Sequence, residues 1–120
     1  MSQSEGRIHQ ECYVWFHNTF PEYRGLLCYN FGNSKNRIDG ALNRSKGLQA
    51  GRADFTLYWS ADCTVFIEMK DDHGRQSTAQ MAWQRLVEAR GFRYLVCRSI
   101  DDFIDIINKI IDGGCCEHLR

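Results

Sequence analysis

The sequence predicts an α/β protein in which a mixed β-sheet is flanked by helices. Apolar residues recur at helical spacing in three segments, 4–20, 77–90 and 99–111, and β-prone segments lie between them. The predicted element order is α-β-(α)-β-β-α-β-α. A helix of about 14 residues before the last strand is long enough for a right-handed crossover to a parallel neighbour. A mixed sheet covered by helices is therefore the expected architecture.

The first helix is predicted over residues 4–20, because Ser4 can cap its start and Pro21 cannot continue it. Its buried stripe consists of residues at helical spacing: Ile8, Cys12, Trp15, Phe16 and Thr19. At about 100° per residue, Glu5 lies roughly 35° from the centre of this stripe. The sequence thus places a carboxylate in the first turn on the side that faces the core, where it also complements the helix dipole.

The two later helices have equally clear boundaries. The helix over 77–90 begins with Ser77 and Gln80 at capping-box spacing and ends before Gly91. Ser99 is placed to cap the last helix. The buried stripe of that last helix is Phe103, Ile104, Ile107, Ile110 and Ile111.

Four strands are predicted, with a short helix over 38–46 between the first two. The strands span residues 26–31, 53–59, 63–70 and 92–97. The short connection around 60–62 predicts an antiparallel hairpin of the second and third strands. Paired positions in such a hairpin sum to about twice the number at the turn centre, so position 54 should lie opposite roughly position 68.

The length and composition predict one folded domain over 1–120, with a core of about 4–111 and a flexible tail over 112–120. No stretch approaches the roughly 20 apolar residues of a membrane span, and the first residues contain no apolar signal core. We therefore expect a cytoplasmic protein without a membrane partner.

Six cysteines occur, and without a secretory signal they are expected to be reduced thiols. Four of them lie far apart in apolar stretches, where a free thiol behaves as a small hydrophobic side chain. The remaining pair, Cys115 and Cys116, stands close to His118 near the end of the sequence. These three could chelate a metal, but no partner pair with ligand spacing occurs elsewhere.

The net charge is zero, but its distribution along the chain is uneven. Between Arg24 and Arg52 there are six basic residues and one acid, Asp39, so this segment carries +5 and the rest of the chain −5. A basic segment beside an acidic cluster suits a phosphate backbone next to a cation, and a solvated loop explains the same segment equally well. The residues predicted to contact nucleic acid are Lys35, Arg37, Arg44, Lys46 and Arg52.

The hairpin brings together the side chains with the most informative chemistry. Glu68 and Lys70 are two residues apart on one strand and project to the same side, and Asp54 falls opposite Glu68. Two acids that close repel each other unless a cation lies between them. Such a site suits Mg²⁺ or Mn²⁺ and hydrolysis of a phosphodiester, without an organic cofactor. Taken alone, however, Glu-x-Lys is also a common exposed charge pattern.

Two further polar residues have ambiguous roles. Gln80 could approach the metal site, because its helix follows the third strand, but it equally satisfies the capping box. His73 follows Lys70 in a loop and could assist proton transfer, although loop histidines are commonly just exposed. The remaining histidines, His9, His17 and His118, are not assigned to the site.

The ordered motifs resemble a known nuclease family. The segments GLQAGRADF at 47–55, FIEMK at 66–70 and GRQSTAQMAW at 74–83 are similar to the VRR-NUC domain of the PD-(D/E)xK nuclease superfamily. The likeness extends over about residues 4–111. It implies a restriction-endonuclease-like fold of the stand-alone type found in phages and bacteria. Such proteins tend to be homodimers that act on DNA, including branched DNA such as Holliday junctions.

The resemblance also implies roles for individual residues. Asp54 and Glu68 would be metal ligands, together with the backbone carbonyl of Met69. Lys70 would be the catalytic lysine. Glu5 would match the glutamate of the first helix that assists at the metal, in agreement with its helical phase.

Gln80 would match the glutamine of the family's S-x-x-Q segment and is therefore included among the catalytic residues. One departure is Ala53, where the family usually has proline; proline stiffens the backbone but supplies no ligand. The leading hypothesis is a metal-dependent DNA endonuclease. A non-catalytic DNA-binding module and a structural subunit of a repair or packaging assembly are the alternatives.

Overall fold

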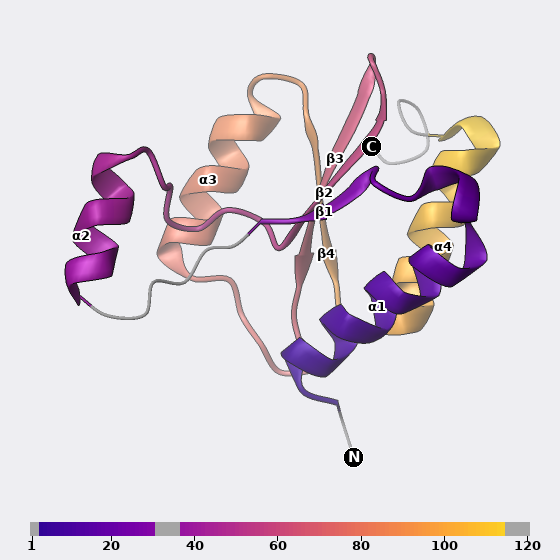
Figure 1. Cartoon of the computed structure of the whole chain (residues 1–120), viewed down its shortest axis with the longest axis horizontal. Helices are drawn as coiled ribbons and strands as arrows, with labels where there is room; N and C mark the ends of the chain where they lie inside the picture. Colours follow the sequence, from indigo (N-terminus) through magenta and orange to yellow (C-terminus); the bar gives the residue numbers. More distant parts are fainter. Residues whose placement is uncertain (1–2, 31–36, 115–120) are drawn as a thin grey trace.

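The computed structural model describes residues 3–30 and 37–114, and it has the predicted element order (Figure 1). The α-helices are α1 (Glu5–Thr19), α2 (Arg37–Ser45), α3 (Thr78–Glu88) and α4 (Ile100–Lys109). The strands are β1 (Leu27–Tyr29), β2 (Phe55–Ser60), β3 (Cys63–Met69) and β4 (Arg93–Cys97). Two short irregular helices, Pro21–Tyr23 and Ile110–Gly114, follow α1 and α4.

The strands form one mixed sheet in the order β1-β2-β3-β4. The first three strands are antiparallel, whereas β4 runs parallel to β3 after the α3 crossover, as predicted. In the hairpin, Phe55 pairs with Ile67 and Thr56 with Phe66. One more step along this register places Asp54 opposite Glu68, so the predicted hairpin geometry is confirmed.

Helices cover both faces of the sheet (Figure 1). α1 and α4 pack against one face and against each other, and α3 packs on the other face. The core between α1, α4 and the sheet is apolar; its largest buried members are Phe16, Phe55, Leu57, Ile67, Met69, Phe103, Ile107 and Ile110. Thr19 was predicted to belong to the buried stripe of α1, but it is exposed. It is the last residue of the helix, and the buried residues of α1 are Ile8, Cys12 and Phe16.

The caps form as predicted: the side chains of Ser4, Ser77 and Ser99 each accept a backbone hydrogen bond at the start of their helix. The first strand is shorter than the predicted 26–31 and ends at Tyr29, and Phe31 lies outside the described residues. Within the described part of the chain, no helix is long and apolar enough to cross a membrane.

The expectation of reduced thiols is wrong at one position. Cys12, Cys28 and Cys97 are free, but Cys63 is disulfide-bonded. Cys63 opens β3 next to the hairpin turn, and the apolar pattern around it predicts burial of the side chain for a free thiol and a disulfide alike. Cys115, Cys116 and His118 lie outside the described residues.

Candidate active site

The predicted acids meet where β2 begins and β3 ends. Asp54 directly precedes β2, and its Oδ2 accepts a hydrogen bond of 2.6 Å from the backbone amide of Met69 in β3. This bond joins the aspartate to the Glu68-Met69-Lys70 segment. On the other side of that segment, the amide of Lys70 donates to the carbonyl oxygen of Cys97 at the end of β4.

Glu68 is fully buried, and its two carboxylate oxygens have different surroundings. Oε1 accepts hydrogen bonds from the hydroxyl of Tyr94 and from Nε2 of Gln76, the latter at 3.1 Å. The Gln76 amide also donates to Oε1 of Gln84 at 2.8 Å. In contrast, Oε2 is buried and has no hydrogen-bond partner among the described residues. Because an unpartnered buried carboxylate oxygen is costly, Oε2 is a natural position for a cation.

Among residues 3–30 and 37–114, Lys70 carries the positive charge that lies nearest to that oxygen. Its Nζ lies 4.0 Å from Oε2 of Glu68, and the residue is only 7% exposed. The loop behind it is held by Arg98, whose Nη1 donates to the carbonyl oxygens of Asp71 and Gly74 at 2.8 and 2.7 Å. A side chain at Gly74 would come within 3.2 Å of Cδ of Lys70, so glycine leaves room for the lysine stem.

Glu5 faces the same site from the first turn of α1. It lines a pocket of about 340 Å³ together with Asp54, His9 and Tyr29. Burial raises the pKa of Glu5; Lys70 opposes this shift, and the nearby acids reinforce it. Burial also raises the pKa of Asp54, although the Met69 amide and His9 favour its charged form. A cation in this pocket would offset the cost of keeping both carboxylates charged.

A close backbone contact ties the segment before Asp54 to the start of α3. Gly51 has a φ of 81°, and a Cβ at this position would lie 2.3 Å from the carbonyl oxygen of Ala79. No other residue type fits there without displacement of the backbone.

Three residues of this site were not assigned to it from the sequence: His9, Gln76 and Tyr94. His9 lies one helical turn after Glu5 and stacks on Phe55, with ring centroids 4.2 Å apart. Burial lowers the pKa of His9, and Asp54 opposes that shift. For His9 the i, i+4 relation to Glu5 was a usable signal. Burial, together with the Glu68 carboxylate, raises the pKa of Tyr94 and keeps its hydroxyl a donor.

The remaining residues that the sequence predicts for the site have other positions or contacts in the structure. The side-chain oxygen of Gln80 accepts from the Ser77 amide, so Gln80 completes the capping box, and its catalytic role stays a prediction. Arg52 donates to Oδ1 of Asn30 at 2.9 Å, close to Asp54 in the chain. Arg44 and Lys46 are exposed near the end of α2, Arg37 begins that helix, and Lys35 lies outside the described residues.

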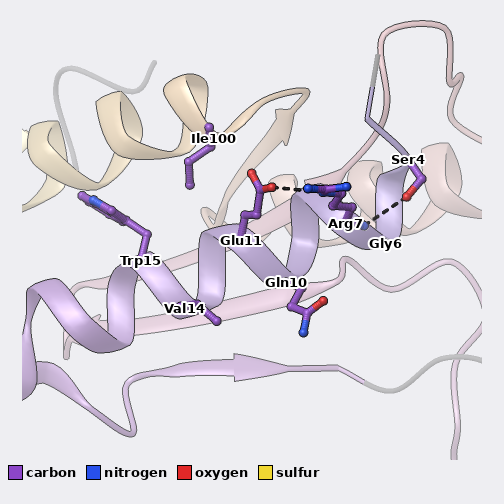
Figure 2. Close-up of a pocket in the computed structure, with 8 residues that line it drawn as sticks. All are labelled: Ser4, Gly6, Arg7, Gln10, Glu11, Val14, Trp15 and Ile100. Atoms are coloured by element: carbon purple, nitrogen blue, oxygen red, sulfur yellow. Dashed lines mark hydrogen bonds and ion pairs between the residues drawn. The ribbon is translucent and has the colours of Figure 1, made fainter. Parts of the chain in front are cut away.

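A second, larger hollow of about 800 Å³ lies along α1 (Figure 2). Its lining includes the Arg7–Glu11 ion pair, Trp15 and Ile100 of α4, but none of Asp54, Glu68 and Lys70. Nor do residues 3–30 and 37–114 contain a preformed group of three His, Cys, Asp or Glu side chains that could hold a metal. The residues at Glu68 instead fit an open kind of Mg²⁺ site. In such a site one or two carboxylates hold the ion, and water and substrate phosphate complete its coordination shell.

The candidate site thus consists of two acids and a lysine at the ends of paired strands in a mixed sheet. The family model described as "VRR-NUC domain" matches residues 13–101, and the chain belongs to this family of nuclease domains. A solved structure described as "VRR_NUC domain protein" is similar over 100% of both chains, with a TM-score of 0.76 and 17% identity, a likeness that concerns the fold. No curated protein matches the chain.

Proposed function

We propose that this protein is a Mg²⁺- or Mn²⁺-dependent DNA endonuclease whose centre consists of Asp54, Glu68 and Lys70. The observation that supports it most is the fully buried Oε2 of Glu68, which has no hydrogen-bond partner in residues 3–30 and 37–114 and lies 4.0 Å from Nζ of Lys70. The large majority of buried side-chain oxygens are hydrogen-bonded, and a bound cation would supply the missing partner of this one. Membership of a nuclease family supports the same assignment.

In this proposal Asp54, Glu68 and the backbone carbonyl of Met69 hold the metal, and Glu5 assists. When bound, the metal supplies positive charge that polarises the phosphoryl oxygen and acidifies a water molecule. Tyr94 and Gln76 hold Oε1 of Glu68 in place, so Oε2 points in one fixed direction.

Hydrolysis joins the oxygen of water to phosphorus and breaks one P–O ester bond, and the leaving oxygen takes up a proton. The ammonium of Lys70 donates hydrogen bonds to the attacking water or to a phosphoryl oxygen, where negative charge grows in the transition state. The low exposure of Lys70 and Glu68 keeps these interactions strong, since little water competes for them.

Two finer parts of the proposal derive from the family resemblance: a homodimer, and action on branched DNA such as Holliday junctions. A single nuclease domain over 1–120 and a place in the cytoplasm rest on the length and composition of the sequence, and the resemblance adds that the cell is a bacterium or a phage-infected host. A dimer would present two sites to one substrate, which suits paired cuts across a junction. Gln80 and the basic residues between Arg24 and Arg52 would assist at the substrate.

The direct test incubates the protein with a four-way junction and a linear duplex of matched sequence, in Mg²⁺, Mn²⁺ or EDTA. Lys70→Ala is the active-site variant. Lys109→Ala is the matched control, because Lys109 is exposed and pairs with Asp105 on α4. We expect metal-dependent cutting that Lys70→Ala loses and Lys109→Ala keeps. Binding of either DNA without cutting by the wild type would favour a non-catalytic DNA-binding module.

A further inference from the structure

An aromatic groove continues from the acid pocket along α1. It has a volume of about 640 Å³ and lies between α1 and the edge strand β1. His9 and Tyr29 line both the groove and the pocket that contains Glu5 and Asp54, so the two hollows adjoin. The rings that line the aromatic groove are those of His9, Tyr13, Tyr29 and Phe55.

The aromatic rings form both the base and the sides of the groove. His9 and Tyr13 lie nearly parallel to Phe55, at interplanar angles of 22° and 15°, and Phe55 is buried beneath them. Tyr29 meets His9 edge-on at 77°, with ring centroids 4.7 Å apart. Tyr13 and Tyr29 are 41% and 56% exposed, which leaves much of each ring free for a flat ligand.

The chemistry of the groove favours a base over a phosphate. None of its lining residues carries an Asp, Glu, Lys or Arg side chain. A phosphate would require cations or several aimed donors, whereas a nucleobase needs apolar and aromatic surface with few polar groups. Gln10, an exposed residue of the lining, supplies an amide that can both donate to and accept from the edge of a base.

The position of the groove relates it to the proposed reaction. Glu5, His9 and Tyr13 follow one another at four-residue spacing on one side of α1, so Tyr13 lies about 12 Å from Glu5 along the helix axis. A strand with its phosphate at the acids would therefore have a neighbouring nucleotide beside these rings.

We propose that the aromatic groove binds one unpaired nucleobase of the strand whose phosphate lies at Asp54 and Glu68, by stacking on Tyr29 with the edge of the base toward Tyr13. This inference rests on the proposed nuclease function and specifies its substrate class. A base within a continuous duplex must first unstack and unpair before it can enter, which disfavours its binding. The preferred substrates are then DNA strands with an unpaired nucleotide beside the cut, as in single strands, flaps and branch points.

The test uses single-stranded DNA of about 12 nucleotides with 2-aminopurine placed at successive positions, and the fully paired duplex of the same sequence. Binding is measured with Mg²⁺ in the Lys70→Ala background, and each sample is run on a gel to verify that the DNA is intact. The variants are Tyr29→Ala, Tyr29→Phe and, as a matched control, Tyr58→Ala. Tyr58 is 52% exposed on β2 and does not line the groove.

We expect fluorescence quenching at one or two adjacent positions of the single strand and none in the duplex. Tyr29→Ala should remove the quenching and weaken binding about 5- to 150-fold, the contribution of one base–aromatic stack. Tyr29→Phe keeps the ring and should retain both. Equal affinity and quenching for Tyr29→Ala and Tyr58→Ala would overturn the inference.

The same variants distinguish failure of this inference from failure of the proposed function. Efficient cutting of flapped DNA by both Tyr29→Ala and Tyr58→Ala, with Lys70 intact, would support the nuclease function and contradict the base-binding site. Quenching that depends on the Tyr29 ring, in a protein that cuts no DNA, would support the base-binding site and contradict the nuclease function.

Discussion

The two faces of β3 are both covered by helices, but they differ in the polarity of their side chains. On one face the side chains are apolar, fully buried and packed against α1 and α4: Val65, Ile67 and Met69. On the other face Phe66 contacts Trp83 of α3, and next to it Glu68 is equally buried, but one of its oxygens has no hydrogen-bond partner among the described residues. Burial of the apolar side chains on the first face stabilises the fold. Burial of the Glu68 carboxylate on the second face costs free energy, and the proposed metal binding accounts for that cost. The comparison can be tested by substitutions on each face.

The largest effect is expected on activity, at the polar side of the strand. Lys70→Ala should lower the cleavage rate about 10²- to 10⁴-fold, since it removes the ammonium beside Glu68. The melting temperature in EDTA should also fall, because the buried carboxylate of Glu68 loses its neighbouring positive charge. Cleavage assays and thermal unfolding measure the two quantities. An unchanged rate would contradict the role of Lys70.

On the core face the effect should fall on stability. Ile67→Ala removes a fully buried side chain and should lower the free energy of unfolding by about 2–5 kcal/mol in urea titrations. Leu86→Ala is the control, since Leu86 is 64% exposed on α3 and should change stability by less than about 0.5 kcal/mol. If Ile67→Ala lost activity but kept its stability, the division between the faces would be wrong.

A smaller effect is expected from the hydroxyl that holds Glu68. Tyr94→Phe keeps the ring but removes the donor to Oε1, and should weaken Mg²⁺ binding about 10- to 100-fold. The Mg²⁺ concentration needed for half-maximal cleavage, or for thermal stabilisation, reports this change. Tyr58→Phe should behave as wild type. An unaltered Mg²⁺ titration would show that Gln76 alone positions the carboxylate.

The smallest effect is a pH dependence of stability at Asp54. Burial raises the pKa of Asp54, so its charged form costs free energy in the metal-free folded state. That cost is complete above the raised pKa and vanishes as pH falls to the unfolded value of about 3.9. In EDTA, Asp54→Asn should therefore be more stable than wild type at neutral pH, and the difference should shrink on acidification. Urea unfolding across pH measures it; a difference independent of pH would contradict the buried-carboxylate argument.

The fold and the central residues were predictable because their signals are local. Alternation along the strands and the short turn fixed the pairing of Asp54 with Glu68, and serines at helix starts predicted three caps. Tyr94 and Gln76 could not be found in this way. Both reach Glu68 from other segments of the chain, and no sequence spacing reports that approach.

The disulfide at Cys63 escaped prediction because an apolar stretch surrounds free and disulfide-bonded cysteines alike. Gln80 illustrates a different difficulty, because one pattern fits two roles. Its capping bond is present in the structure, and only an activity measurement can test the catalytic role.

The close approach of Gly51 to Ala79 has a consequence for local opening of the protein. The segment that leads into Asp54 and the first turn of α3 lie against each other without an intervening side chain. Neither can move away without exposing backbone groups of the other, so the two should open as one cooperative unit. In amide hydrogen exchange, protection of these segments should then rise and fall together, and a ligand at the acids should slow exchange in the first turn of a helix that it does not touch.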